Sequence, residues 1–442
     1  MSSLSERTLF YLMLDRDSMN SLSLEGLDSE VIPTEELRPI YEWSIRYFNR
    51  GGRVVAPTAE LFRNSKLPNG FSMYDVLSKY DIRLEEPLDD ELPTVEWAVE
   101  ELRSSWLTAK THEWTRRMTT AVTMALPEDR QSVLAEHATE LIGMSLRLEP
   151  KISRIEVGES ASDILIDYEQ RKATQGTFRG MGLGLGDVDH WTNGIHSGEL
   201  AIMAAGPKTG KSYMIDHVAL KEWENGRNVA LFTLENSIEM TRDRIACMAL
   251  GINPTDIDRG LLTPEAEEAL RDWASDFAKS NTKLHILKPD VKDCTPEQIV
   301  MKARLLGVDS LLIDQLTFVE PPDKSEKARY IQIRDIMHTI KNLISTGRDQ
   351  MPCLMAHQIN REGMRTARKN GYHRMDDMAE GSEVERTADL SLTMFASEEY
   401  RLANRFLLQI VASRRSPINA WDINWNIETG IMRVHGEADI EL

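Results

Sequence analysis

The most informative stretch of this chain is Ala204-Ala205-Gly206-Pro207-Lys208-Thr209-Gly210-Lys211-Ser212 (AAGPKTGKS). It follows the apolar run ELAIMAA and precedes the helix-like run SYMIDHVALKEW. A glycine-rich turn between a strand and a helix points its backbone N–H groups inward and so binds phosphate. The strict pattern G-x-x-x-x-G-K-[ST] has glycine where this chain has Ala205, which adds one Cβ at the entrance of the loop. We predict that residues 205–212 bind nucleotide phosphates; the alternative is a chance G-K-S match.

The pattern on the carboxyl side of Gly180 predicts the rest of this fold. Short apolar runs alternate there with amphipathic helical segments, which is typical of an α/β fold with a mostly parallel sheet covered on both faces. The apolar runs are ELAIMAA, NVALFTLE, LHILK, SLLIDQ, PCLMAH, LSLTMFA and FLLQIVAS. We therefore expect residues 180–442 to form one α/β domain.

The preceding residues read as two further parts. Residues 1–150 are expected to form an all-α domain with long helices from about 94 to 125 and from about 127 to 148. Residues 151–179 read as a linker with one amphipathic helix, from Ser162 to Arg171. That helix either packs on a neighbouring subunit or is a plain connector, and the pattern leaves both open.

Length and composition limit the class of protein. A chain of 442 residues with 41% hydrophobic and 28% charged residues is expected to contain more than one soluble globular domain. Its 52 basic and 71 acidic residues give a net charge of −19, which argues against attraction of nucleic acid to the whole surface. Three scattered cysteines indicate a reducing compartment and no zinc ribbon. With no apolar run of membrane-spanning length and no signal peptide, we expect a cytoplasmic protein without a membrane partner.

Nucleotide hydrolysis needs more than a phosphate loop, and three polar residues at strand ends supply candidates. Lys211 would reach the β- and γ-phosphates, and the Ser212 hydroxyl and Asp314, which ends the run SLLI, would hold Mg²⁺. Glu235 follows the run VALFTL and is the candidate for activating water, and Gln358 follows CLMAH and could sense the γ-phosphate. Strand carboxyl ends line the ligand crevice of open α/β sheets. Each could instead be an ordinary capping or turn residue.

A basic segment is the candidate for nucleic-acid binding. Residues 360–374 (NREGMRTARKNGYHR) contain five cations against one acid, Glu362, in an otherwise acidic chain. Gly363 and Gly371 predict a flexible loop, next to the γ-phosphate sensor, that grips single-stranded DNA through its phosphates. A solvated basic loop is the alternative. The cations are Arg361, Arg365, Arg368, Lys369 and Arg374.

At this point the order of elements resembles that of the hexameric replicative DNA helicases of bacteria and their phages, the DnaB-like family with a RecA-like ATPase core. The similar segments are the lead-in 186–200, FTLE at 232–235, LLID at 311–314, HQINR at 357–361 and DMAEGSEVERTAD at 377–389. Members often have alanine at the position of Ala205. The helical first 150 residues and the linker helix also fit this architecture.

The resemblance implies roles for residues that the pattern alone does not single out. Arg414 falls at the position of an arginine that reaches the neighbouring subunit's ATP, and Ala412 falls where a lysine is usual, so that Arg415 is a candidate replacement. Glu380 and Gly381 fall in the DNA-contacting segment, where Ala379 replaces a common arginine. The resemblance also implies that Glu235, Lys211 and Gln358 are catalytic.

The leading hypothesis is a replicative helicase that uses ATP and Mg²⁺ to move along single-stranded DNA and unwind duplex at the fork. It would work as a ring-shaped homo-oligomer, expected to be a hexamer, with a primase and a helicase loader as further expected partners. If a phage encodes it, its compartment is the bacterial host's cytoplasm. Two alternatives remain: a RecA-like strand-exchange ATPase that forms open filaments, and a non-motor ATP-binding scaffold or signalling ATPase.

Overall fold

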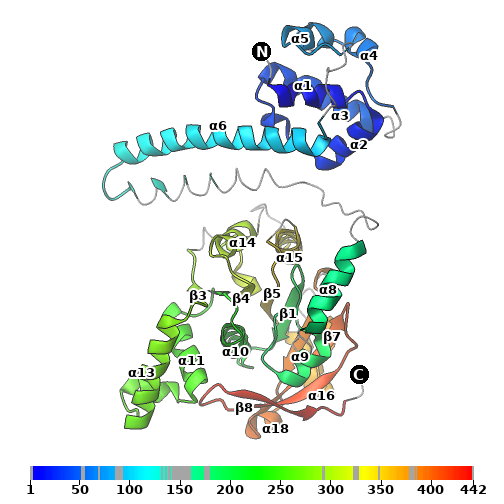
Figure 1. Ribbon diagram of the computed structural model, residues 1–442. Helices are drawn as coiled ribbons and strands as arrows, with labels where there is room; N and C mark the ends of the chain where they lie inside the picture. The colour runs from blue at the N-terminus through cyan, green and yellow to red at the C-terminus, as the bar shows by residue number, and fades with distance from the viewer. Residues whose placement is uncertain are drawn as a thin grey trace. The chain divides into compact units, whose positions relative to one another are not determined.

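The chain forms two compact units, Met1–Ser160 and Ala161–Leu442, each described here by itself (Figure 1). The computed structural model describes residues 3–50, 55–67, 70–84, 93–130, 133–134, 137, 141, 161–173, 180–290, 294–321, 328–346, 349–377, 384 and 386–440. The division into 1–150, 151–179 and 180–442 stays a prediction, because the units do not test a separate linker.

The first unit is helical in its described residues. Its α-helices are α1 (Leu4–Leu12), α2 (Arg16–Glu25), α3 (Arg38–Arg50), α4 (Ala59–Asn64), α5 (Met73–Lys79) and α6 (Val95–Met124). They enclose a core that includes Phe10, Phe48 and Leu102, all fully buried. The helix expected from 94 to 125 is confirmed as α6, and the Thr94 hydroxyl caps it by accepting the Trp97 N–H at 3.3 Å. The helix expected from 127 to 148 lies mostly outside the described residues.

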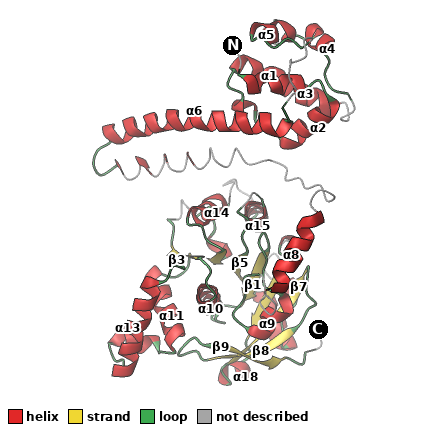
Figure 2. Ribbon diagram, in the orientation of Figure 1, coloured by secondary structure: helices red, strands yellow, loops and turns green. Residues whose placement is uncertain are grey.

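The second unit is built on a nine-stranded sheet in the order β3-β2-β4-β5-β1-β6-β7-β8-β9. Figure 2 colours its strands yellow and the surrounding helices red. From β3 to β6 all neighbours are parallel, and β6-β7, β7-β8 and β8-β9 are antiparallel. The mostly parallel sheet and all seven predicted strands are therefore confirmed. The strands are β1 (Leu200–Ala205), β2 (Val229–Thr233), β3 (Leu284–Leu287), β4 (Ser310–Asp314), β5 (Cys353–Gln358), β6 (Leu390–Phe395), β7 (Arg405–Ser413), β8 (Ala420–Trp425) and β9 (Met432–Glu437).

Alternation along the strands buries both faces of the sheet. In β1, Ala201, Met203 and Ala205 join the core formed with α10 and α11. Leu200, Ile202 and Ala204 join the opposite core, formed with α14 and α15. The helices of this unit are α8 (Ala161–Ala173), α9 (Gly186–Thr192), α10 (Lys211–Glu224), α11 (Ile238–Leu250), α12 (Pro254–Arg259), α13 (Pro264–Lys279), α14 (Pro296–Leu305), α15 (Arg329–Ser345), α16 (Arg361–Asn370) and α18 (Glu398–Leu402). The helix expected from Ser162 to Arg171 is present as α8. Among the described residues, no helix is long and apolar enough to cross a membrane.

The basic segment 360–374 is not the flexible loop that its glycines predict. Its first part is the helix α16, which Asn360 caps by accepting the Gly363 N–H at 2.6 Å. A Cβ on Gly363 would collide with the backbone and side chain of Asp377, so this glycine permits close packing. Gly371 ends the helix at φ +85°, a conformation that favours glycine. Both glycines thus serve packing and helix termination.

Candidate nucleotide-binding site

The carboxyl ends of β1, β2 and β5 and the start of α10 surround a cavity of about 460 Å³. Such a size is ordinary for a small-molecule site. The phosphate loop, Glu235 and Gln358, predicted separately from sequence, all line this one cavity. The lining residues are Gly206, Pro207, Lys208, Gly210, Lys211, Ser212, Tyr213, Glu235, Arg244, Gln358, Trp425 and Ile427.

The phosphate loop connects the buried end of β1 to the first turn of α10. Ala205 is the last residue of β1 and pairs with Gln358 of β5 and Met394 of β6, so its methyl group belongs to the sheet core. Gly210 caps α10 at φ +91°, and a Cβ there would lie 2.6 Å from the Trp425 ring. Glycine is therefore needed at 210, whereas alanine at 205 fits.

Lys211 is buried at the base of the cavity. Its Nζ donates to Oε1 of Gln315 at 2.7 Å. Burial lowers the pKa of Lys211, while the nearby carboxyl groups of Asp314 and Glu235 act in the opposite direction. A buried cation of this kind gains most from an anion placed beside it, such as a phosphate group.

Asp314 is the last residue of β4, the strand that pairs with β2. Burial raises the pKa of its carboxyl, against the opposing effects of Ser212 and Lys211. Its Oδ1 is buried without a hydrogen-bond partner in the described part of the chain. One carboxylate and one hydroxyl beside a phosphate loop suit Mg²⁺, which takes few protein ligands when phosphates and water supply the rest.

Sequence reasoning missed three side chains of this site. The first is Gln315, which follows Asp314 in the chain and accepts the Lys211 hydrogen bond. Trp425 comes from β8, which was not predicted, and neither was β9, because their sequences AWDINW and MRVHGE contain no continuous apolar run and both strands are partly exposed. Arg244 of α11 also lines the cavity.

Arg244 is held on two sides. Its Nη1 donates to Oδ2 of Asp216 at 2.7 Å, and its guanidinium lies 4.5 Å from the centre of the Tyr213 ring. Burial raises the pKa of Asp216 to about 7, although Arg244 acts to lower it. Asp216 and Arg244 lie on the core-facing sides of two successive helices. Because a single charge rarely lies unpaired in a protein core, this pattern could have predicted their ion pair.

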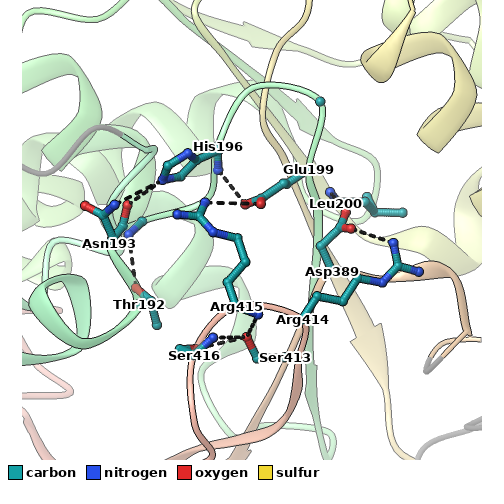
Figure 3. Close-up of polar contacts among 12 residues, drawn as sticks. Thr192, Asn193, His196, Glu199, Leu200, Asp389, Ser413, Arg414, Arg415 and Ser416 are labelled. Atoms are coloured by element: carbon teal, nitrogen blue, oxygen red, sulfur yellow. Dashed lines mark hydrogen bonds and ion pairs between the residues drawn. The ribbon is translucent and has the colours of Figure 1, made fainter. Parts of the chain in front are cut away.

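Arg414 does not lie in this cavity. Because β7 runs antiparallel to β6, its last residue, Ser413, pairs with Leu390 at the first residue of β6, far from the phosphate loop. The Arg414 guanidinium contacts Asp389 there, and Arg415 contacts Glu199 at 3.2 Å (Figure 3). Arg414 is thus at the opposite edge of the sheet from its own chain's nucleotide site.

The candidate DNA-binding cations follow Gln358 in the chain. Arg365, Arg368 and Lys369 of α16 are exposed and share one face at helical spacing, opposite the buried Ala367. Arg361 begins the helix, and Arg374, beyond it, lies near the Tyr372 ring. Glu380 and Gly381 lie outside the described residues.

Comparison with known proteins places the chain in a family. It is 24% identical over 272 residues to "Replicative DNA helicase DnaB" of Geobacillus stearothermophilus, covering 58% of this chain and 57% of that protein. It is 26% identical over 252 residues to "Replicative DNA helicase DnaB" of Helicobacter pylori, covering 56% of this chain and 49% of that protein. These matches span about half the length of the relatives.

Two solved structures share the fold. A solved ATPase domain matches 64% of this chain and 99% of its own, with a TM-score of 0.56 and 21% identity. "The Structure Of A DnaB-Like Replicative Helicase And Its Interactions With Primase" matches 97% of this chain and 98% of its own, with a TM-score of 0.64 and 18% identity. The family model described as "DnaB-like helicase C terminal domain" matches residues 180–432, and the chain therefore belongs to the DnaB-like helicase family.

Proposed function

We propose that this protein is an ATP-driven DNA helicase whose nucleotide site is the cavity at the phosphate loop. The observation that carries the proposal is the meeting of Lys211, Ser212, Glu235 and Gln358 around one cavity, although they come from separate elements. Phosphoryl transfer depends on positioning and charge stabilisation, and these are the residue types that it needs.

Each residue has a distinct role in the proposed hydrolysis. Lys211 binds the β- and γ-phosphates, which replace Gln315 as its partner. Mg²⁺ held by Ser212 and Asp314 would neutralise phosphate charge. Glu235 orients and deprotonates the attacking water, and Gln358 contacts the γ-phosphate from the end of β5.

Helix α16 is the proposed link between nucleotide and DNA. It begins three residues after Gln358, and the Sδ and Cε atoms of its Met364 lie within 3.4 Å of where a Cβ on Gly206 would be. A shift of the phosphate loop would therefore press on α16, whose exposed face carries Arg365, Arg368 and Lys369. These cations, with Arg361, Arg374, Glu380 and Gly381, are proposed to contact the phosphates and sugars of single-stranded DNA.

The proposed active form is a ring of identical subunits, expected to be a hexamer. Arg414 lies too far from its own phosphate loop to reach its own nucleotide, so it would serve the site of the next subunit. An arginine supplied in this way accelerates hydrolysis strongly in other nucleotide hydrolases. Binding to a primase and to a helicase loader is part of the proposal, as is action in the cytoplasm.

The test is unwinding of a forked DNA duplex by the purified protein with ATP and Mg²⁺, beside Glu235→Gln. We expect the native protein to separate the strands. The variant should bind ATP but hydrolyse it at least about 100-fold more slowly, because it loses the base. Glu239→Gln is the matched control, since Glu239 is an exposed acid of α11 that does not line the cavity.

Two results would count against the proposal. If Glu235→Gln unwinds as fast as Glu239→Gln, Glu235 has another role. If the native protein hydrolyses ATP at a rate that ignores single-stranded DNA and does not unwind the fork, the protein is a non-motor ATPase. Particle images that show open filaments on DNA instead of closed rings would favour strand exchange.

A further inference from the structure

A single buried carboxylate, that of Asp389, organises the edge of the sheet that carries Arg414 (Figure 3). Its Oδ1 accepts from Nη1 of Arg414 at 2.9 Å. Its Oδ2 accepts from the backbone N–H of Leu200 at 2.8 Å and from Nζ of Lys341 at 2.6 Å. The Asp389 backbone carbonyl accepts the Arg414 N–H at 3.0 Å, so the arginine is tied at both main chain and side chain.

The anchoring leaves the guanidinium able to bind a second anion. Nη2 of Arg414 donates to the carbonyl of Arg386 at 2.8 Å, so the described bonds use one N–H on each Nη. A guanidinium has five N–H donors, and three remain for a phosphate. The Arg414 side chain is also 54% exposed, whereas that of Asp389 is 9% exposed. The acid thus holds the inner side of the guanidinium and leaves the outer side accessible.

Asp389 itself is held firmly. Leu200 begins β1, and Lys341 comes from α15 and donates its second bond to the carbonyl of Gly198 at 2.7 Å. The carboxylate is therefore held by two elements of the core, β1 and α15, in addition to its contact with Arg414. A long arginine side chain loses substantial rotamer entropy when it is ordered, and an anchor of this kind removes that loss from the reaction.

We propose that Asp389 is the positioning residue of Arg414, which it pre-orients for the neighbouring subunit's nucleotide, and that Lys341 fixes Asp389 for this task. The inference rests on the proposed function, in which Arg414 acts between subunits. It assigns Asp389 an effect on the neighbour's hydrolysis and none on the nucleotide site of its own chain.

The test uses rings of two co-expressed variants, purified through two different tags and assayed for ATP turnover with single-stranded DNA. Arg414→Ala subunits keep an intact nucleotide site but lack the arginine. Lys211→Ala subunits have a defective nucleotide site but keep Arg414. Each alone should be inactive, and mixed rings should recover turnover. If mixed rings do not recover turnover, Arg414 does not act between subunits. That result would contradict the proposed function itself, whatever the effect of changing Asp389.

The role of Asp389 is tested by introducing Asp389→Asn either into the subunits that donate Arg414 or into the subunits that receive it, and comparing the two kinds of mixed ring. In the Lys211→Ala subunits, which donate Arg414, it should lower the recovered kcat about tenfold with the KM for ATP unchanged. Lys341→Met in the same subunits should lower kcat in the same direction, by less. In the Arg414→Ala subunits, Asp389→Asn should leave the recovered turnover intact, because those subunits only receive the arginine.

Comparing the two kinds of mixed ring distinguishes an effect on the orientation of Arg414 from an effect on the folding of the subunit. A purely structural role of Asp389 would lower turnover equally in both placements, and that result would overturn the proposal. Full recovery with Asp389→Asn in the donating subunits would overturn it as well. Thermal unfolding of both double variants checks that the amide, which still offers an oxygen to the Leu200 N–H, preserves the fold.

Discussion

For single residues, burial shifts the pKa values of the ionisable groups around the nucleotide site. It lowers the pKa of Lys211 and raises that of Asp314, and neighbouring opposite charges compensate in part. His217 of α10 is a simpler case, because it is 4% exposed and its ring nitrogen Nε2 contacts the carbonyl of Gly184 at 3.3 Å. Burial lowers the pKa of His217 to about 4 from an ordinary 6.5.

His217 should make stability depend on pH in a defined direction. The unfolded chain protonates this ring near pH 6.5 and the folded chain only near pH 4, so its contribution is complete above pH 6.5 and is lost as pH falls towards 4. Relative to His217→Gln, the native chain should lose roughly 3 kcal/mol of unfolding free energy across this interval. Urea titrations at pH 7.5, 6, 5 and 4 measure the unfolding free energy of both proteins. A difference between the native chain and His217→Gln that stays constant with pH would contradict this prediction.

At the scale of elements, α16 connects the basic surface to the phosphate loop through close packing. Gly363 faces Asp377 with no room for a side chain, while Met364 faces Gly206. The sequence did not predict the helical form of this element, because glycines interspersed with cations resemble a loop when packing partners are unknown.

Gly363→Ala should displace α16. Alanine gains up to about 1 kcal/mol of helix propensity over glycine, but overpacking against a backbone costs about 1–3 kcal/mol, so we expect a net loss of stability. DNA-stimulated ATP turnover should fall more than turnover without DNA. Thr366→Ala, a change on the same helix at a half-buried residue with no such contact, is the control and should alter the unfolding free energy by less than about 0.5 kcal/mol. Equal effects of the two changes would refute this explanation of Gly363.

At the scale of the whole molecule, charge is distributed unevenly. The chain carries −19 overall, while Arg365, Arg368 and Lys369 form an exposed cationic face on one helix. A net negative charge of this size disfavours attraction of nucleic acid to the surface as a whole, so we expect DNA to bind at the cationic face.

Replacing these three cations with glutamine should weaken binding to single-stranded DNA regardless of its sequence. The slope of log K against log salt should become shallower by about 2, since each lost phosphate contact removes about 0.7. The control replaces Arg259, Arg271 and Lys279 of α12 and α13, which gives the same net charge away from α16. Fluorescence anisotropy with labelled single-stranded DNA across a salt series measures the binding constant of each triple variant. Identical slopes for both variants would show that α16 is not the DNA contact.

Local sequence patterns predicted the α/β class, the seven strands with continuous apolar runs, the helix α6 and the phosphate loop. These features depend on neighbouring residues, since periodicity and a contiguous motif need no knowledge of distant contacts. The sequence also located Glu235, Asp314 and Gln358, because parallel strands end at one edge of a sheet.

The contacts between distant segments depend on the three-dimensional fold and could not be predicted from local sequence. Lys211 meets Gln315 across 104 residues, Leu200 meets Asp389 across 189, and the Trp425 ring packs on Gly210 from a strand that local pattern did not reveal. The antiparallel return of β7 placed Arg414 at the edge away from its own nucleotide site. Strand order and direction create these contacts, and the polarity of single residues contains no information on either.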